Sequence, residues 1–237
     1  MNKIKLMYHQ LLKEYGPQGW WPVTPIGGCD GSKPEGPIYG IKSKNGKQRL
    51  EIAFGALLTQ NTQWKPNVEN AIIRLNKLHL IDIDNLLEAE HEVIAKAIKS
   101  SGYFNQKAKK LKYLCRFLKK HPLDRLKSMD TWKARELLLS IKGIGPETAD
   151  SILLYALDRP IFVVDAYTRR IFSNLGMIQA DASYDEIQKM FMDNLEDDAE
   201  LFNEYHALVV EHAKSCYGRG KDYKKCPLYA LFADKEQ

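Results

Sequence analysis

The first residue that invites a chemical interpretation is Asp165, which follows an apolar run at 161–164 and precedes the sequence AYTRRIF. Aspartate is favoured as an N-cap, so this carboxylate is expected to cap a helix that begins at Ala166. A carboxylate held in this way can also stabilise positive charge on a substrate, or direct a water molecule at an electrophilic carbon. The two interpretations are compatible, because capping fixes the orientation of the carboxylate.

A second feature is the sequence Gly143-Ile144-Gly145, which interrupts an apolar helical pattern that resumes at Pro146. Glycine adopts positive φ at little cost, so the pair predicts a sharp reversal between two helices, with Ile144 turned back into the core. Pro146 suits the first position of the second helix. The free N–H groups beside it lie at the positive end of the helix dipole, where anions bind. The turn is therefore either an ordinary packing joint or a phosphate site.

Three tryptophans are candidates for binding a flat ligand. Trp20 and Trp21 precede Pro22, and Trp64 follows the sequence LLTQNTQ. Indole faces bind planar cations by stacking and cation–π attraction, and each contact contributes roughly 0.5–2 kcal/mol. Packing in the core or on the surface is the alternative for each ring. The Gly/Pro-rich surroundings favour a ligand, but the sequence does not decide which of Trp20 and Trp21 would stack on it.

Helical periodicity supplies the elements that must position these residues. Apolar residues recur at three- and four-residue steps in segments 51–60, 67–78, 91–100, 105–120, 131–141, 146–157, 166–176, 183–195 and 200–216. The N-terminal sequence MNKIKLMYHQLLKEYG predicts a further amphipathic helix. Residues 22–47 differ, since their Gly, Pro, Ser and Lys content predicts a long loop with a small hairpin near GPIYGIKSKNGK. The expected fold class is all-α.

The composition allows a large core and a polyanionic partner. Of the 237 residues 44% are apolar, and the net charge is +5. Lys and Arg dominate residues 99–125, which are either a solvated helix face or a surface that faces phosphates. No long uncharged apolar run is present, so we expect no membrane span and no membrane partner. The charged N-terminal stretch predicts a helix rather than an export signal, so we expect a cytoplasmic protein with reduced thiols, associated with the nucleoid in a prokaryote.

The hairpin resembles the helix-hairpin-helix motif of the endonuclease III superfamily of DNA glycosylases, in which L-x-G-x-G-x-x-T-A precedes an apolar helix and V-D. The matching residues of this chain are Ile141, Gly143, Gly145, Thr148, Ala149, Val164 and Asp165. The sequences LLTQNTQW (57–64) and GYFNQKAKKL (102–111) resemble two further motifs of the superfamily, in the same order. The resemblance runs from about Trp20 to Phe232.

This resemblance implies the two-domain helix-hairpin-helix DNA glycosylase fold, with the active-site cleft between the domains. A six-helix barrel domain at 50–158 would end in the helix-hairpin-helix. Residues 1–49 and 159–237 would form a discontinuous helical domain that includes a vestigial cluster loop at 216–232. We expect a monomer that binds double-stranded DNA containing a damaged base.

The resemblance assigns the essential aspartate of the superfamily to Asp165. It also gives meaning to Glu147, because members that cut the DNA strand have a lysine at this position, whose amine attacks the sugar and forms a Schiff base. Glutamate cannot form a Schiff base, and Lys142 lies before the turn rather than at the matching position. The sequence therefore predicts a monofunctional glycosylase of base excision repair with water as nucleophile and no AP-lyase activity.

Three motifs resemble those of the endonuclease-III-like 3-methyladenine DNA glycosylases: W-W-P, L-T-Q-N-T followed by an aromatic residue, and G-[FY]-[FY]-N-Q-K-A. In that branch the W-W-P tryptophans and the aromatic residue matching Trp64 sandwich the base. Alkylated purines such as 3-methyladenine are cationic and leave readily. The alternatives are a glycosylase for oxidised pyrimidines or mismatched adenine or thymine, and a non-catalytic helix-hairpin-helix DNA-binding protein. The presence of Asp165 argues against the last.

Several residues are expected at the duplex. Flipping a base leaves a hole in the stack, and the resemblance places the wedge that fills it at Gln60 and Asn61; a polar turn is the alternative. The residues expected to contact the DNA backbone are Gly143, Gly145, Glu147, Thr148, Lys107 and Lys110, with Lys109 beside them. The resemblance also implies a monovalent cation, Na⁺ or K⁺, at the carbonyls of Leu139, Ile141 and Ile144.

Many superfamily members hold an iron–sulfur cluster with the spacing C-x6-C-x2-C-x5-C. That spacing, started at Cys216, reaches Tyr223, Cys226 and Phe232. Two thiolates cannot hold a four-thiolate cluster, so we expect no iron–sulfur cluster and no other resident cofactor. The remaining cysteines are distant in sequence: Cys29 and Cys115. Cys216 and Cys226 are then free thiols, or else they form a disulfide or a Zn site completed by His206 or His212.

Overall fold

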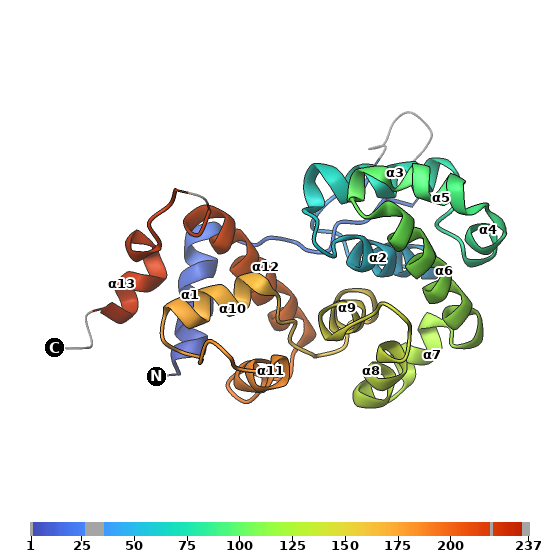
Figure 1. The fold of residues 1–237 in the computed structure, drawn as a ribbon. Helices are drawn as coiled ribbons and strands as arrows, with labels where there is room; N and C mark the ends of the chain where they lie inside the picture. Colours follow the sequence, from blue (N-terminus) through green and yellow to red (C-terminus); the bar gives the residue numbers. More distant parts are fainter. Residues whose placement is uncertain (1, 27–35, 219, 234–237) are drawn as a thin grey trace. The chain divides into compact units, whose positions relative to one another are not determined.

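The computed structural model in Figure 1 describes residues 2–26, 36–218 and 220–233. Within these ranges every regular element is a helix, as the periodicity predicted. The described residues also contain an isolated antiparallel β-bridge between Val23 and Ile38. The hairpin expected within 36–47 is therefore not seen, because Ile38 pairs with Val23 and a helix begins at Gly46. Residues 27–35, which include Cys29, lie outside the described residues.

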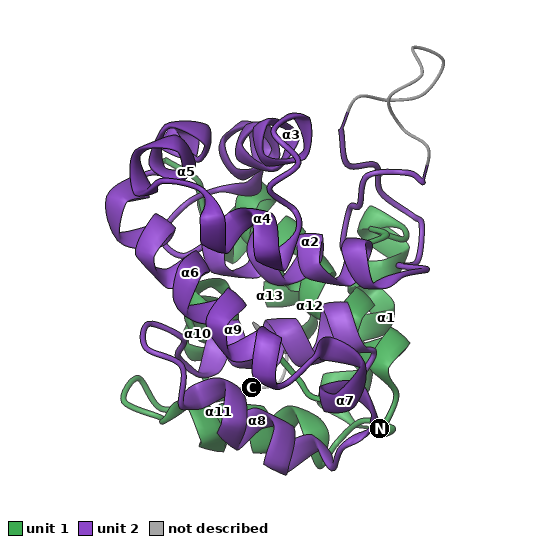
Figure 2. Cartoon of the chain, turned by 90° about the vertical axis from the view of Figure 1, so that its right-hand side faces the viewer, with its two compact units in different colours: residues 1–20, 160–237 green, residues 21–159 purple. Residues whose placement is uncertain are grey.

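The chain forms two compact units, shown in different colours in Figure 2. Unit 1 contains residues 1–20 and 160–237, and unit 2 contains residues 21–159. The helices of unit 2 are α2 (Gly46–Leu58), a π-helical turn (Trp64–Val68), α3 (Glu69–Lys77), α4 (Ile83–Glu88), α5 (His91–Ala97), a 3₁₀ turn (Lys99–Ser101), α6 (Phe104–Lys120), α7 (Leu123–Ser128), α8 (Thr131–Leu139) and α9 (Pro146–Ser151), which continues as a π-helical turn (Ile152–Ala156).

Helix α2 runs through the interior of unit 2. All eight residues at 51–58 are buried, which is the pattern of a helix surrounded by others rather than of a surface helix. Helix α6 is amphipathic instead, with a buried face that includes Ala108, Leu111 and Leu118. This face packs against α2, α4 and α5. Of the basic residues predicted on a solvated or phosphate-facing surface, Lys109, Arg116, Lys119 and Lys120 are exposed on α6, whereas Lys107 belongs to its buried face.

Residues 21–26 and 36–49 pack within unit 2, whereas residues 1–49 were predicted to belong to the other domain. Buried side chains of α2 hold this segment. The carboxylate of Glu51 accepts hydrogen bonds from the Thr24 N–H at 2.7 Å and from the Asn76 amide at 2.6 Å. The Gln48 amide donates to the Thr24 carbonyl at 3.0 Å. Gln48 and Glu51 occur within a helical pattern that does not indicate these long-range bonds. The predicted domain boundary at residue 49 therefore lies later in the chain than the boundary after residue 20 in the structure.

Unit 1 consists of α1 (Lys3–Tyr15), α10 (Ala166–Asn174), α11 (Tyr184–Met192), α12 (Ala199–Cys216), a 3₁₀ turn (Tyr223–Lys225) and α13 (Pro227–Ala233). Helices α1 and α10 both pack against α12. An aromatic core joins them, in which the rings of Phe162 and Phe191 stack at 3.8 Å between centroids. The hydroxyl of Tyr205 donates to the Ile4 carbonyl at 2.9 Å and ties α12 to α1.

The apolar run 161–164 leads into this core and delivers Asp165 to the start of α10. Its four side chains are buried, and the run forms neither strand nor helix. The amide of Gln188 donates to the Phe162 carbonyl at 2.6 Å and so satisfies a buried backbone oxygen of the run. A short apolar run is therefore a buried connection that ends in the carboxylate.

None of the described helices offers an apolar stretch long enough to cross a lipid bilayer.

Candidate functional site

Asp165 is the N-cap of α10, as the sequence predicted. Its Oδ1 accepts hydrogen bonds from the Thr168 N–H at 2.7 Å and from the Thr168 hydroxyl at 2.9 Å. Its side chain is 13% exposed, so it is mostly enclosed but still reached by solvent. One carboxylate oxygen is thus used by the cap, and the other, Oδ2, is directed elsewhere.

That second oxygen faces His206 on α12, with Nε2 and Oδ2 3.6 Å apart. Burial would raise the pKa of Asp165, but the hydrogen bonding and charge of His206 and the two Thr168 donors outweigh it and lower the pKa below the usual value. The carboxylate is therefore ionised at neutral pH. His206 was not predicted at this site, because it lies far along the chain and no local motif marks it; its one predicted role was in a Zn site.

The hairpin between α8 and α9 forms as predicted. Gly143 has a φ of +92°, which L-residues rarely adopt, and Ile144 is 6% exposed and points into the core. Gly145 is the N-cap of α9 and Pro146 its first residue. Apart from the neighbouring residues in the chain, no atom of the described residues lies within 4 Å of where a Gly145 Cβ would be. The backbone at Gly145 is therefore open to a ligand, whereas Gly143 is covered by the Lys110 side chain, 2.8 Å from where its own Cβ would be.

A buried ion pair fixes the two helices of the hairpin. Arg135 on α8 donates twice to the carboxylate of Asp150 on α9, at 2.7 Å and 3.2 Å. Asp150 is fully buried and the Arg135 side chain is 12% exposed. A bidentate pair of this kind fixes geometry as well as distance. This pair was not predicted, because in the sequence Asp150 is only the residue that follows the T-A of the motif.

Gln60 and Asn61, predicted together as the wedge, have different surroundings. The Gln60 amide donates to the Gly143 carbonyl at 3.1 Å and to the Thr148 hydroxyl at 2.9 Å, and its oxygen accepts from the Lys110 ammonium at 2.5 Å. Asn61 is exposed and has a φ of +54°. The structure therefore brings Gln60, Lys110 and the hairpin into one network.

Lys107 does not fit its predicted role as a phosphate contact. It is 2% exposed, and its ammonium donates to the carbonyls of Leu58 at 2.7 Å and Ser101 at 2.6 Å and to the Thr62 hydroxyl at 3.0 Å. These acceptors use all three ammonium hydrogens. Burial lowers the pKa of Lys107 to about 8. Its ammonium joins the end of α2 to the turn before α6, whereas Lys109 on the same helix is exposed and Lys110 is half-buried.

Trp21 and Trp64 meet inside unit 2, whereas Trp20 belongs to unit 1. The two indoles lie edge to face, with centroids 5.4 Å apart and planes at 85°. Tyr155 packs on Trp21 at 5.1 Å, and Gly55 leaves room for that indole. Trp21 is 8% exposed and Trp64 is 6% exposed. A base between parallel rings would therefore require one of these indoles to turn.

Tyr103 is an exposed aromatic residue that the sequence analysis did not single out. Its side chain is 67% exposed, and its backbone has a φ of +44° at the start of α6. The loop of residues 59–62 lies next to it, since the Thr62 hydroxyl donates to the Ser101 carbonyl at 2.5 Å. Exposure of a large aromatic ring on a strained backbone was the missing signal, and it cannot be read from the sequence.

In the described residues, packed aromatic rings surround the segment where the iron–sulfur cluster spacing was traced from Cys216. Tyr223 stacks on Tyr217 at 5.5 Å and meets Tyr229 edge to face at 5.9 Å. Cys216 and Cys226 are free thiols, and no group of three His, Cys, Asp or Glu residues within the described ranges could hold a metal ion. A four-thiolate cluster does not fit this donor set. The side chain of Phe232 lies outside the described residues.

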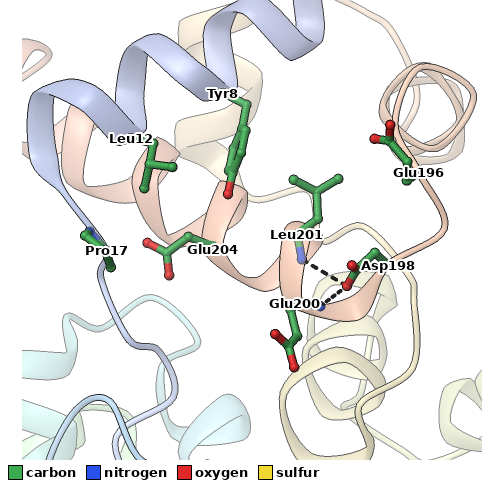
Figure 3. A pocket seen from close by; sticks show the side chains of 8 residues that line it. All are labelled: Tyr8, Leu12, Pro17, Glu196, Asp198, Glu200, Leu201 and Glu204. Carbon is green, nitrogen blue, oxygen red and sulfur yellow. Dashed lines mark hydrogen bonds between the residues drawn. The ribbon is translucent and has the colours of Figure 1, made fainter.

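Figure 3 shows a hollow in unit 1 whose charge is wrong for DNA. It has a volume of about 550 Å³ and is lined by Tyr8 and several acids. These acids are engaged in the fold. Asp198 caps α12, Glu204 accepts from the Gln18 N–H at 2.5 Å, and Glu196 pairs with Lys5. The hollow therefore reflects helix capping and packing rather than a site for a phosphate.

Comparison with known proteins agrees with this geometry. The chain is 41% identical over 235 residues, 96% of both chains, to a provisionally assigned DNA repair glycosylase of Methanocaldococcus jannaschii. It is 30% identical to endonuclease III of Sulfolobus acidocaldarius, over 76% of this chain and 81% of that one. Among solved structures, the 3-methyladenine DNA glycosylase of Helicobacter pylori bound to 1,N6-ethenoadenine superposes with a TM-score of 0.68, at 27% identity, over 91% of this chain and 98% of that one.

The family comparison covers the segment that contains residues 59–62, α6, the hairpin and Asp165. Residues 54–197 match the description "HhH-GPD superfamily base excision DNA repair protein". This segment includes more than half of the chain and holds both the glycine turn and the capped carboxylate. With its helical fold, its glycine hairpin and a full-length relative at 41% identity, the chain belongs to the HhH-GPD superfamily of base excision DNA repair glycosylases, which act on DNA.

Proposed function

We propose that this protein is a monofunctional DNA glycosylase that hydrolyses the N-glycosidic bond of alkylated purines such as 3-methyladenine. The observation that carries the proposal is the ionised carboxylate of Asp165, fixed by Thr168 and facing His206. Departure of the base develops positive charge on the sugar, and a fixed anion stabilises that charge without having to reorganise. Water then adds to the anomeric carbon, and the carboxylate can orient it.

The absence of lyase activity follows, in this proposal, from the identity of residue 147. Glu147 is exposed at the start of α9 and has no amine with which to form a Schiff base. The neighbouring lysines of unit 2 are placed otherwise. The Lys142 ammonium lies 5.9 Å from the centre of the Tyr113 ring, and Lys107 is engaged by three oxygen acceptors.

Alkylated purines suit the aromatic cluster of Trp21, Trp64 and Tyr155. A cationic base is already a good leaving group, so a protein that binds it must hold a flat cation rather than protonate it. Stacking and cation–π contacts contribute roughly 0.5–2 kcal/mol each. Because the cluster is closed by its own edge-to-face packing, binding would open it by turning an indole. The likeness to the Helicobacter pylori enzyme supports this class of base.

DNA binding would use the hairpin and the start of α6. The open backbone at Gly145 admits a phosphate to the N-terminus of α9, and Lys110, which lies across Gly143, adds positive charge. Exposed Tyr103 offers a ring on which a base can stack. Glu147 and Thr148 are adjacent to the same backbone; Thr148 already accepts a hydrogen bond from Gln60.

The hairpin carbonyls of Leu139, Ile141 and Ile144 would suit a monovalent cation, since hard cations take oxygen ligands. The Ile141 carbonyl already accepts from the Ile144 N–H at 3.0 Å and retains a second lone pair. Such an ion would lower the electrostatic cost of bringing a phosphate to the turn. We propose no iron–sulfur cluster and no other cofactor, and visible absorbance of the purified protein would contradict this.

The test is release of bases from duplex DNA. Methylated DNA is incubated with the protein, and free 3-methyladenine and 7-methylguanine are measured beside duplexes that contain hypoxanthine or thymine glycol. We expect release of 3-methyladenine and no covalent adduct after borohydride reduction, with a lyase-competent superfamily member as the positive control. Release of thymine glycol alone would favour a pyrimidine-specific enzyme instead. A borohydride adduct would refute the monofunctional mechanism.

A further inference from the structure

We propose that Asn61 alone is the wedge, and that Gln60 is a positioning residue that holds the wedge loop (residues 59–62) on the hairpin. This division of roles rests on the proposed function, because a wedge requires a flipped base. It differs from the sequence prediction, which gave the wedge role to both residues. The observations that separate them are the hydrogen bonds of Gln60 and the exposure of Asn61.

The Gln60 amide is held by the protein at both its nitrogen and its oxygen. A primary amide has two N–H donors and one carbonyl oxygen. The nitrogen donates to the Gly143 carbonyl at 3.1 Å and the Thr148 hydroxyl at 2.9 Å. The oxygen accepts from the Lys110 ammonium at 2.5 Å, a charge-assisted bond. To enter a duplex, Gln60 would have to break all of these bonds and leave Thr148, which is 5% exposed, short of a partner.

The partners of Gln60 come from the two other elements that would face DNA. Gly143 and Thr148 belong to the hairpin, and Lys110 belongs to α6. The Lys110 stem lies across Gly143, because a Cβ at that glycine would be 2.8–2.9 Å from three of its carbons. One ammonium hydrogen of Lys110 is directed at Gln60, which leaves two for a phosphate. Gln60 therefore sets the position of the phosphate-binding turn relative to the wedge loop.

Asn61 has the opposite surroundings. It is exposed, and within the part of the chain that the structure describes its side chain has no hydrogen-bond partner. Its φ of +54° is a conformation that asparagine tolerates better than most residues. The loop around it is fixed, since the Thr62 N–H donates to the Thr59 carbonyl at 3.0 Å and Lys107 holds the Thr62 hydroxyl. A rigid loop thus presents one free polar side chain.

The experiment compares three variants in an Asp165→Asn background, which prevents turnover. Gln60→Met keeps the volume without the hydrogen bonds, and Gln60→Ala serves as the second variant at that position. Asn61→Gly removes the side chain and keeps positive φ accessible. The probes are an undamaged duplex and a duplex with a tetrahydrofuran abasic analogue beside 2-aminopurine. Binding affinity, its salt dependence and the fluorescence change at saturation are measured, and thermal unfolding reports folding.

We expect Asn61→Gly to lose the 2-aminopurine change while its Kd stays within about threefold of the parent. Gln60→Met should keep the change at saturation, but bind both duplexes about tenfold more weakly, with a salt slope smaller by about one phosphate contact. Loss of the fluorescence change in Gln60→Met but not in Asn61→Gly, or in both, would overturn the assignment. A parent protein that binds neither duplex would refute the proposed function, and this inference with it.

Discussion

Alanine substitutions at the two hairpin glycines should separate folding from DNA binding. Gly143 has a φ of +92°, and a Cβ there would meet Lys110 carbons at 2.8–2.9 Å. Left-handed backbone costs an L-residue about 1–2 kcal/mol. The Lys110 stem is flexible and can move aside, so the backbone strain should dominate the loss. Gly143→Ala should therefore lower Tm by roughly 2–8 °C for a chain of this size.

Gly145→Ala should cost much less stability. Its φ of −102° and ψ of −179° are open to any residue, and no described atom beyond its chain neighbours lies within 4 Å of the new methyl group. Replacing glycine at a compatible position stabilises by about 0.4–1 kcal/mol, because the unfolded chain loses freedom, and this offsets the poorer N-cap that alanine makes. The methyl would nevertheless occupy the approach of a phosphate to α9. Binding to duplex DNA should weaken about tenfold, which corresponds to about 1.4 kcal/mol.

Differential scanning calorimetry and fluorescence anisotropy with a labelled duplex measure the two effects in the same preparations. We expect Gly145→Ala to melt closer to the wild-type temperature than Gly143→Ala and to bind DNA more weakly than the wild type. A Gly145→Ala variant that loses as much stability as Gly143→Ala, or that binds DNA as tightly as the wild type, would refute this prediction.

Three other predictions concern the ionisable groups. Asp150→Ala removes a buried bidentate pair and should cost about 3–5 kcal/mol, against about 1 kcal/mol or less for the exposed Asp124→Ala; equal losses in urea unfolding would contradict this. Burial lowers the pKa of His212 to about 4, so between pH 6.5 and 4 the unfolded chain binds a proton that the folded chain does not. The free energy of unfolding should therefore fall by about 3 kcal/mol as the pH is lowered from 6.5 to 4. A urea series in which His212→Phe keeps the same slope over that range would be inconsistent with this. His206→Phe removes the group that most lowers the pKa of Asp165, so the acid limb of the excision profile should move to higher pH; an unmoved limb would exclude His206 from the site.

Local patterns predicted the elements of this fold well, because they depend on neighbouring residues. The 3.6-residue period placed the long helices within a few residues of their observed ends, and the Gly-x-Gly-Pro pattern located the hairpin between α8 and α9. The capping preference of aspartate predicted the bond from Asp165 to Thr168. Short helices such as α4 and α7 were not predicted, because six residues show too little periodicity.

The sequence did not predict the contacts between residues that are far apart in the chain. Nothing near Lys107 indicates that it is buried against carbonyls of Leu58 and Ser101, so a lysine in a basic stretch was assigned to the surface. His206 reaches Asp165 only because α12 packs against α10. In the sequence, Gln60 and Asn61 were indistinguishable as wedge candidates, and only the fold places the hairpin within hydrogen-bond distance of Gln60. In each case the partner depends on tertiary packing, which a single sequence does not encode locally.

The most direct test of the account is single-turnover release of 3-methyladenine by the wild type and by Asp165→Asn at equal DNA occupancy. Asparagine also caps helices, so the variant should keep its fold. The account predicts release by the wild type, a rate at least about a hundredfold lower in the variant, and an unchanged affinity for DNA. A variant that releases the base within a few fold of the wild-type rate would contradict the role of this carboxylate.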